Sequence, residues 1–173
     1  MELGDILISE KEIAGAVEEI AAKVSKDYDP SKLVLVGAMD GAVCFLADLM
    51  RSLETPVAVT TVRIRRYEGT EGGELTVSWL PLRERIAGQD VLIVEGVVDT
   101  GATCALLVQK LRELESASVN ICALLDKPAR REHDVEPTYC GFDVPDVFVV
   151  GYGLDYRGAY RNLRDVHVLN GEQ

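Results

Sequence analysis

The sequence predicts an α/β fold, with a twisted and mostly parallel sheet that carries helices on both faces. Three short runs, within residues 33–36, 90–96 and 119–125, are almost entirely apolar, which is typical of strands covered on both sides. Segments with helical spacing of apolar residues alternate with these runs, as they do in βαβ units. At 173 residues the chain has the size of one domain, so we expect a single domain over residues 1–173.

The first predicted element is a helix at residues 10–26. Ser9 and Glu12 form a capping-box pattern at its start. Its apolar face repeats at helical spacing through Ile13, Val17, Ile20 and Val24. Asp29-Pro30 ends the segment, and the apolar strand that follows ends at Gly37.

A second helix is predicted from residue 42 to about residue 53, and a strand at 57–66 follows it. Residues 68–74 are glycine-rich and acidic and have nothing to bury, so we expect a mobile loop over about 67–75. A strand at 75–80 returns from this loop.

The second half of the chain repeats the pattern of strand, helix and strand. After the strand within 90–96 come a short turn and a helix that runs to about residue 114. The strand at 119–125 follows, and two more strands are expected at 148–153 and 166–169. Parallel strands end at one edge of a sheet, and that edge is where such folds bind ligands. We therefore expect the loops after the strands to converge there.

The formal net charge of −11 limits the possible partners. So acidic a surface repels nucleic acids and anionic lipids, and neither is an expected partner. No apolar run approaches the roughly 18 residues of a membrane span, and the N-terminus does not resemble a signal peptide. The four cysteines show no zinc-site spacing, so we interpret them as reduced thiols of a cytoplasmic protein.

The turn that follows the strand within 90–96 has the parts of a phosphate-binding loop. Gly101 allows a close approach of the backbone, Thr100 and Thr103 offer hydroxyl groups, and the N-terminus of the next helix favours an anion. Glu95 and Asp99 stand beside it and would suit ribose hydroxyls, a metal ion or a proton in transit. The alternative is an ordinary helix N-terminus, capped by Asp99 or Thr100.

Four stretches of the chain together resemble the purine phosphoribosyltransferases, in their hypoxanthine–guanine branch. The stretch VLIVEGVVDTGATC at 91–104 looks like the motif of this family that binds phosphoribosyl pyrophosphate (PRPP). Residues 124–133 and 139–164 resemble the hypoxanthine–guanine branch, and residues 33–51 are more weakly similar. The resemblance implies the type I phosphoribosyltransferase fold with a small hood. It also implies Mg²⁺, the ligands PRPP, purine base and purine monophosphate, and a homodimer or homotetramer.

The resemblance also implies roles for individual residues. Thr100, Gly101, Ala102 and Thr103 would hold the 5′-phosphate, Glu95 a ribose hydroxyl, and Asp99 would accept a proton near N7 of the purine. On the base side, Lys127 would contact the 6-oxo group, Phe148 would stack on the ring, and Val149 would offer its backbone. Asp155 would bind Mg²⁺ beside the base, with Glu95 as a second metal ligand. Arg161 would reach the pyrophosphate, next to the loop of Asp40 and Gly41.

Several of these residues also have ordinary structural interpretations. Lys127 would be a solvated lysine at a strand end, Phe148 a core residue, and Asp155 part of a simple turn. Arg161 would be a surface charge. His133 and His167 belong to no recognised pattern, and we interpret them as structural or exposed.

The chain departs from the family pattern at two positions. Gly96 stands where the family has a second acidic residue, and Asp40 stands where the branch commonly has lysine. Tyr67 lacks the serine that usually precedes it, and Arg63, Arg65 and Arg66 are candidate sources of positive charge. The leading hypothesis is an enzyme that uses 6-oxopurines, with hypoxanthine, guanine and xanthine not distinguished. The alternative is a catalytically weakened nucleotide-binding or regulatory protein on the same fold.

Overall fold

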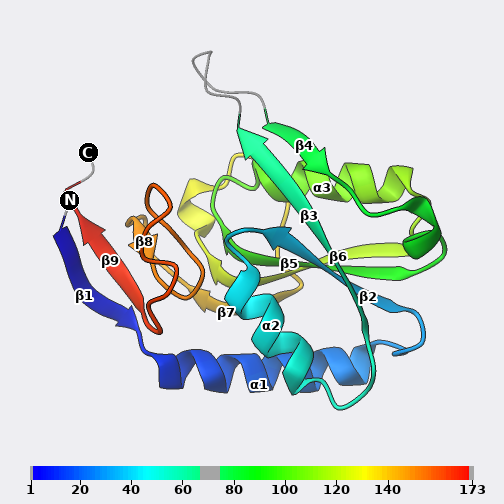
Figure 1. Ribbon diagram of the computed structural model, residues 1–173, viewed down its shortest axis with the longest axis horizontal. Coiled ribbons are helices and arrows are strands. Elements are labelled where there is room, and N and C mark those ends of the chain that lie inside the picture. The colour runs from blue at the N-terminus through cyan, green and yellow to red at the C-terminus, as the bar shows by residue number, and fades with distance from the viewer. Residues whose placement is uncertain (1, 67–74, 172–173) are drawn as a thin grey trace.

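The computed structural model describes residues 2–66 and 75–171, and within them the strands form two sheets. A six-stranded sheet has the order β4-β3-β2-β5-β6-β7, and a three-stranded sheet has the order β1-β9-β8 (Figure 1). The strands are β1 (Glu2–Ile8), β2 (Leu33–Met39), β3 (Ala58–Arg66), β4 (Leu75–Trp79), β5 (Asp90–Val98), β6 (Ser118–Asp126), β7 (Tyr139–Asp143), β8 (Val149–Val150) and β9 (Val166–Asn170). The α-helices are α1 (Glu10–Asp27), α2 (Val43–Ser52) and α3 (Ala102–Glu113).

The large sheet is parallel except at one edge. Strands β3, β2, β5, β6 and β7 run in the same direction, and β4 pairs antiparallel with β3. In the centre, Val36 of β2 lies opposite Ile93 of β5, and Val94 of β5 lies opposite Cys122 of β6. The carboxyl ends of β2, β5 and β6 therefore meet at one edge of the sheet, as the sequence predicts.

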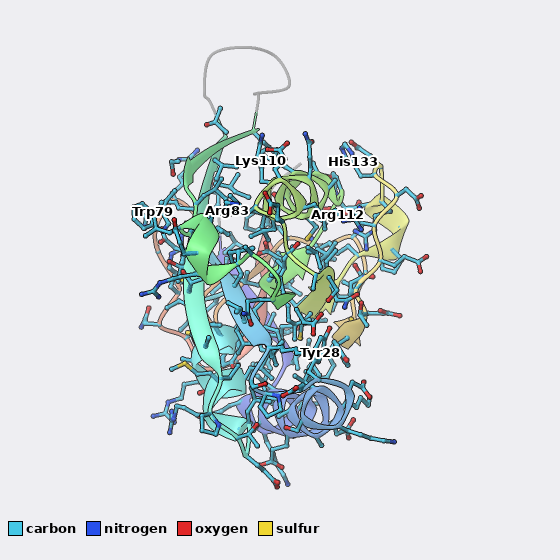
Figure 2. All side chains as sticks on the ribbon, turned by 90° about the vertical axis from the view of Figure 1, so that its right-hand side faces the viewer. Tyr28, Trp79, Arg83, Lys110, Arg112 and His133 are labelled. Carbon is cyan, nitrogen blue, oxygen red and sulfur yellow. The ribbon has the colours of Figure 1, made fainter. Side chains whose placement is uncertain are left out.

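Helices cover both faces of this sheet, which confirms the predicted layers. Helices α1 and α2 pack on one face, where β2 and β5 contribute residues such as Leu35 and Leu92 to the core. Helix α3 packs on the other face through Cys104, Leu107 and Leu111. Figure 2 shows α1 and α3 nearly end-on, on opposite sides of the strands. The capping box at the start of α1 is present, with Ser9 accepting from the backbone of Glu12.

The small sheet brings the two ends of the described chain together as a hood. Strand β1 pairs antiparallel with β9, with Glu2 opposite Asn170, and β8 pairs with the other edge of β9. The hood stands beside the carboxyl ends of the large sheet (Figure 1). A hydrogen bond connects the segment before β9 to the start of α1: the backbone N–H of Glu10 donates to the carboxylate of Asp165 over 2.7 Å.

Two strands were missed by the sequence analysis and one predicted strand is shorter than expected, for local reasons. Strand β1 is largely exposed and β7 contains Gly141 and a charged end, so neither has an apolar pattern that sequence periodicity detects. The strand expected at 148–153 is limited to two residues, because Gly151 and Gly153 have positive φ angles and turn the chain. The loop predicted over 67–75 lies outside the described residues except for Leu75, which begins β4.

No helix within residues 2–66 and 75–171 is long and apolar enough to span a bilayer. All four cysteines are free thiols.

Candidate active site

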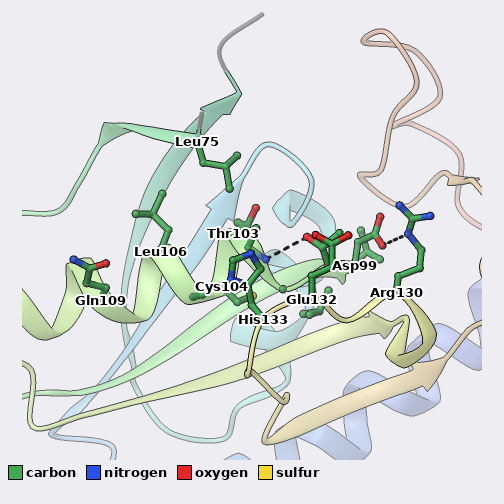
Figure 3. Close-up of a pocket in the computed structure, with 15 residues that line it drawn as sticks. Leu75, Asp99, Thr103, Cys104, Leu106, Gln109, Arg130, Glu132 and His133 are labelled. Carbon is green, nitrogen blue, oxygen red and sulfur yellow. Dashed lines mark hydrogen bonds and ion pairs between the residues drawn. The ribbon is translucent and has the colours of Figure 1, made fainter. Parts of the chain in front are cut away.

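A cavity of about 850 Å³ opens at the carboxyl end of β5. It is lined by the turn that joins β5 to α3, by the first turns of α3, and by residues from the loop after β6. Figure 3 shows Asp99, Thr103 and His133 around this space. The segment that the sequence singled out as a phosphate-binding loop is thus the wall of a real cavity, and not only a helix start.

The predicted phosphate-binding loop, residues 99–103, depends on glycine at position 101. Gly101 has φ +87° and serves as the N-cap of α3, so the chain enters the helix through a left-handed residue. Thr100 accepts a hydrogen bond from the backbone of Ala102 through its hydroxyl, over 3.3 Å. The N–H groups of the first helical turn have no partner inside the helix, so those of Thr103 and Cys104, which follow Ala102, can donate to an anion in the cavity.

The loop after β6 braces the phosphate-binding loop from outside. The backbone N–H groups of Glu132 and His133 both donate to the carbonyl of Thr100, over 2.9 and 3.1 Å. Arg131 donates to the carbonyl of Asp99 over 2.5 Å and forms an ion pair with Asp126, the last residue of β6. Arg131 and Asp126 are mostly buried, so their charges compensate each other away from water.

Sequence reasoning assigned no role to Arg131 or Asp126. The only sequence feature that could have indicated this ion pair is the order of residues: the apolar strand ends at Asp126, and Arg130 and Arg131 follow closely. That pattern does not say which arginine turns inward. Only the path of the loop decides this.

Asp99 lies at the mouth of the cavity with its carboxylate partly exposed. Its Oδ1 pairs with Nε of Arg130 over 2.5 Å, and Arg130 also contacts Asp146 at 3.2 Å. These two carboxylates raise the pKa of Arg130, and the largest cause is the hydrogen bond that Arg130 donates to Asp99. The Asp99 carboxylate is therefore held in its ionised form beside a cation, and its partial exposure leaves it accessible to a ligand.

Glu95 lies deeper than Asp99 and is only 9% exposed. Its Oε1 accepts from the backbone N–H of Gly96 over 3.1 Å. Burial raises the pKa of Glu95 to about 8, and backbone hydrogen bonds from Gly96 and Val97 offset only part of this shift. Without a ligand the carboxyl group is thus largely protonated at neutral pH, which suits a hydrogen bond to a hydroxyl better than a metal ion.

The buried carboxyl group of Glu95 makes stability depend on pH. Its ordinary pKa is 4.5 and its folded pKa is about 8, so the folded state binds more protons between these values. The free energy of unfolding therefore falls as the pH rises through this window. We expect Glu95→Gln to remove this loss, because glutamine keeps the hydrogen-bonding shape and does not ionise. Thermal unfolding of the ligand-free protein at several pH values between 5 and 8 measures it.

The control for this experiment is Glu18→Gln, which changes an exposed carboxylate on α1. It should unfold in parallel with the parent protein across the series. If the Glu95→Gln and parent curves also run parallel, the carboxyl group of Glu95 does not titrate in the folded state as described.

The residues assigned to the purine lie around one end of β6 and β8. Lys127 is 6% exposed and donates from Nζ to the carbonyl of Val147 over 2.7 Å, so its interpretation as a solvated lysine is wrong. Phe148 is 38% exposed, so it is not a core residue, and its ring meets that of Tyr156 edge to face at 5.8 Å. Val149 is buried in β8, opposite Val168 of β9.

Asp155 and Arg161 face each other in the loop that follows β8. Their carboxylate and guanidinium groups are 2.8 Å apart, and both side chains are about one-third exposed. Asp155 also accepts from the backbone of Gly158 over 2.7 Å, so it does shape a turn. Arg161 donates to the carbonyl of Gly153 over 2.6 Å. Arg161 is therefore held by two partners rather than free on the surface.

Asp40 lies on the loop after β2 and forms an ion pair with Arg63 of β3. Both side chains are about half exposed. The peptide between Met39 and Asp40 is cis. Arg63 thus supplies the positive charge beside Asp40 that the sequence left in question, while the side chains of Arg65 and Arg66 and the whole of Tyr67 lie outside the described part.

His133 and His167 occupy different environments. His133 is exposed and lines the cavity beside the phosphate-binding loop (Figure 3). His167 is on β9, with Nδ1 3.2 Å from the carbonyl of Gly4 in the hood. His167 therefore has the structural role that we expected. His133 is exposed, also as expected, and it lies where a ligand in the cavity could contact it.

Within residues 2–66 and 75–171 there is no group of three or more histidine, cysteine or acidic side chains placed to hold a metal ion. Mg²⁺ in phosphate-transfer sites is commonly held by one or two carboxylates together with oxygens of the substrate. Asp155, partly exposed and close to Arg161, has the hard oxygen donor that this arrangement needs. The residues present fit a metal that arrives with a phosphorylated substrate.

Comparisons with known proteins find similarity over nearly the whole chain, and they point to one family. Residues 5–157 match the Phosphoribosyl transferase domain family. A hypoxanthine-guanine phosphoribosyltransferase of Staphylococcus epidermidis is 39% identical over 173 aligned residues, which cover 99% of this chain and 96% of that protein.

Solved structures are similar as well. A hypoxanthine-guanine phosphoribosyltransferase from Bacillus anthracis has a TM-score of 0.90 at 31% identity, covering 97% of this chain and 99% of that chain. A hypoxanthine phosphoribosyltransferase from Staphylococcus aureus has a TM-score of 0.90 at 37% identity, covering 96% and 91%. These likenesses confirm the predicted type I fold.

Proposed function

Because this chain belongs to the phosphoribosyl transferase domain family, in its hypoxanthine–guanine branch, we propose that it makes purine nucleotides for salvage. It transfers the phosphoribosyl group of PRPP to a 6-oxopurine, hypoxanthine or guanine, giving IMP or GMP and pyrophosphate. The observation that carries the proposal is the shared cavity wall. The loop from Asp99 to Thr103 and the loop after Lys127 hydrogen-bond to each other through the carbonyl of Thr100.

In this reaction a bond forms between N9 of the purine and C1 of the ribose, and the bond from C1 to pyrophosphate breaks. Pyrophosphate leaves with the bonding electron pair, and the purine loses a proton. Asp99 is the proposed acceptor of this proton, near N7 of the base. Thr100, Gly101, Ala102 and Thr103 hold the 5′-phosphate at the start of α3, and Glu95 holds a ribose hydroxyl.

The base lies between Lys127 and Phe148 in this proposal. Lys127 donates to the 6-oxo group, the half-exposed ring of Phe148 stacks on the purine, and the backbone of Val149 meets its edge. Asp155 directly precedes Tyr156, whose ring contacts that of Phe148. A ligand oxygen would replace or share the carbonyl of Val147 as the partner of Lys127.

The pyrophosphate side combines charge from separate loops. Arg161 contacts the leaving group, and the backbone at Asp40 and Gly41 lines its path. Asp155 would hold Mg²⁺ together with substrate oxygens, and the metal would supply positive charge beside the leaving pyrophosphate. Glu95 was proposed as a second metal ligand, but its burial and raised pKa favour the ribose role.

Replacing Lys127 with Met tests the base assignment. We expect kcat/KM for hypoxanthine and guanine to fall about 10- to 100-fold, because a charged donor to the 6-oxo group is lost. The relative use of adenine, which lacks that oxygen, should rise. Initial rates with each base measure both effects.

The matched control is Lys110→Met, at a lysine that lies on α3 (Figure 2) and pairs with Glu113 of the same helix. This variant should keep the parent preferences. An unchanged ratio of guanine to adenine use in Lys127→Met would remove Lys127 from the recognition of the base.

The experiment that tests the function is nucleotide formation from PRPP and Mg²⁺, with hypoxanthine, guanine, xanthine and adenine offered separately. We expect turnover with a 6-oxopurine, and omission of Mg²⁺ should abolish it. Folded protein that binds IMP or GMP without turning over any base would favour the weakened, regulatory alternative. No relative described above supports that alternative, since all carry the names of enzymes.

We also propose that residues 1–173 act as one domain, that the protein works in the cytoplasm, and that it assembles as a homodimer or homotetramer. The four free thiols are compatible with a reducing compartment. The acidic surface argues against nucleic acid as a partner.

A further inference from the structure

A single carbonyl oxygen, that of Gly41, lies in a slot between two other glycines. A β-carbon added to Gly96 would lie 2.9 Å from this oxygen, and one added to Gly153 would lie 2.7 Å from it. Both distances are shorter than real β-carbons show, so neither position has room for a side chain. We call this contact of Gly41, Gly96 and Gly153 the glycine slot.

The two walls of the glycine slot need glycine for different reasons. Gly153 has φ +94°, a conformation that residues with side chains rarely adopt, so its backbone alone favours glycine. Gly96 lies within β5, two residues before the strand ends at Val98, and is not among the residues with positive φ. At Gly96 the obstacle is therefore space: the Gly41 carbonyl and, at 3.0 Å, Cδ2 of Leu154.

The glycine slot joins the parts of the site assigned to pyrophosphate. Gly41 belongs to the loop after β2 that carries Asp40. Gly153 is hydrogen-bonded twice to Arg161, since its carbonyl accepts from the guanidinium over 2.6 Å and its N–H donates to the Arg161 carbonyl over 3.0 Å. Arg161 in turn pairs with Asp155. A shift of Gly41 away from β5 would thus separate the loop of Asp40 from that of Arg161.

We propose that Gly96 is a positioning residue for pyrophosphate and PRPP. Its missing side chain allows the loop of Asp40 and Gly41 to rest directly on β5 and against Gly153. This inference depends on the proposed function, and it gives a different meaning to the departure at position 96. The absent acid there is a requirement of packing, and an aspartate in its place would displace the Gly41 carbonyl.

The test is Gly96→Ala, which adds one methyl group and keeps the strand conformation accessible. Calorimetric titration measures the binding of PRPP with Mg²⁺, pyrophosphate with Mg²⁺, and IMP to the parent and the variant. We expect the dissociation constants of PRPP and pyrophosphate to rise on the order of 10- to 100-fold, because the loop is displaced. The dissociation constant of IMP, which has no pyrophosphate group, should change less than about twofold.

Gly141→Ala is the matched control. A β-carbon there would lie 2.7 Å from the carbonyl of Leu124, so the clash with a backbone oxygen is of the same kind, but it lies between β6 and β7. This variant should unfold at a lower temperature and keep the parent ratio of IMP to pyrophosphate affinity. If Gly96→Ala weakens all three ligands equally, or none of them, the positioning role is overturned.

Two further measurements allow the binding result to be interpreted if Gly96→Ala does not fold or if the parent protein makes no nucleotide. If Gly96→Ala does not fold, the double variant with Leu154→Ala removes the 3.0 Å contact and leaves only the Gly41 carbonyl in the way. The same separation of IMP from pyrophosphate is expected in it, and its absence contradicts the proposal. A parent protein that binds PRPP, pyrophosphate and IMP but makes no nucleotide contradicts the proposed function alone, because the binding comparison does not need turnover.

Discussion

Asp99→Asn is expected to reduce kcat by about 10²- to 10⁴-fold while IMP still binds, because asparagine retains the shape of the side chain and does not accept a proton. The carboxylate pairs with Arg130 at the mouth of the cavity, and no other change to the phosphate-binding loop is introduced. Steady-state rates with hypoxanthine measure the loss, and calorimetry with IMP shows whether the site is intact.

The control for this prediction is Asp146→Asn. Asp146 contacts the same guanidinium of Arg130 at 3.2 Å but does not line the cavity as the described residues define it. It should leave kcat within about twofold of the parent. Equal losses in the two variants would attribute the effect to the release of Arg130. Activity near the parent level in Asp99→Asn would remove Asp99 from proton transfer.

Gly101→Ala is expected to abolish most of the affinity for 5′-phosphate ligands. The added β-carbon would lie 2.5 Å from Cγ2 of Val135 and 3.1 Å from Cδ of Arg131, at a residue with φ +87°. The start of α3 must then move away from the brace formed by the loop after β6. We expect the dissociation constants of IMP and PRPP to rise about 100-fold, and the unfolding temperature to fall.

Gly88→Ala separates the two causes of the loss expected in Gly101→Ala, which are backbone strain at a positive φ and the clash of the new β-carbon with its neighbours. Gly88 has φ +71°, so alanine there carries the same type of backbone strain, but nothing lies within 4 Å of its added β-carbon. It should destabilise the protein by about 1 kcal/mol and leave both ligands bound as in the parent. If Gly101→Ala behaves in the same way as Gly88→Ala, the phosphate site does not depend on the closeness of Val135.

The local pattern of the chain was sufficient for much of the fold. Apolar periodicity located α1, α3 and the central strands. A strand with two covered faces is continuously apolar, whereas a helix with one covered face has apolar residues every three or four positions, and the two patterns can be told apart within a short segment. It missed β1 and β7, whose stability comes from partners far along the chain: Asn170 lies opposite Glu2, and Cys140 lies opposite Ala123. A strand at an edge does not need an apolar pattern of its own.

The candidate site was partly predictable for the same reason. The phosphate-binding loop is continuous in sequence, so Thr100, Gly101 and Thr103 can be located from their order alone. The pairing of Asp40 with Arg63 and of Arg131 with Asp126 depends on how separate loops meet. Resemblance to a family supplied residue roles at matching positions, but it supplied no reason for Gly96.

By itself, the sequence determined the layered α/β architecture, the position of the turn between β5 and α3 and the acidic composition, because each depends on neighbouring residues or on composition. The tertiary structure alone decided that Lys127 is buried, that Glu95 has a pKa of about 8, and that Gly41 leaves no room at Gly96. Burial, desolvation and close approach are properties of the space between segments, and that space exists only after the chain has folded.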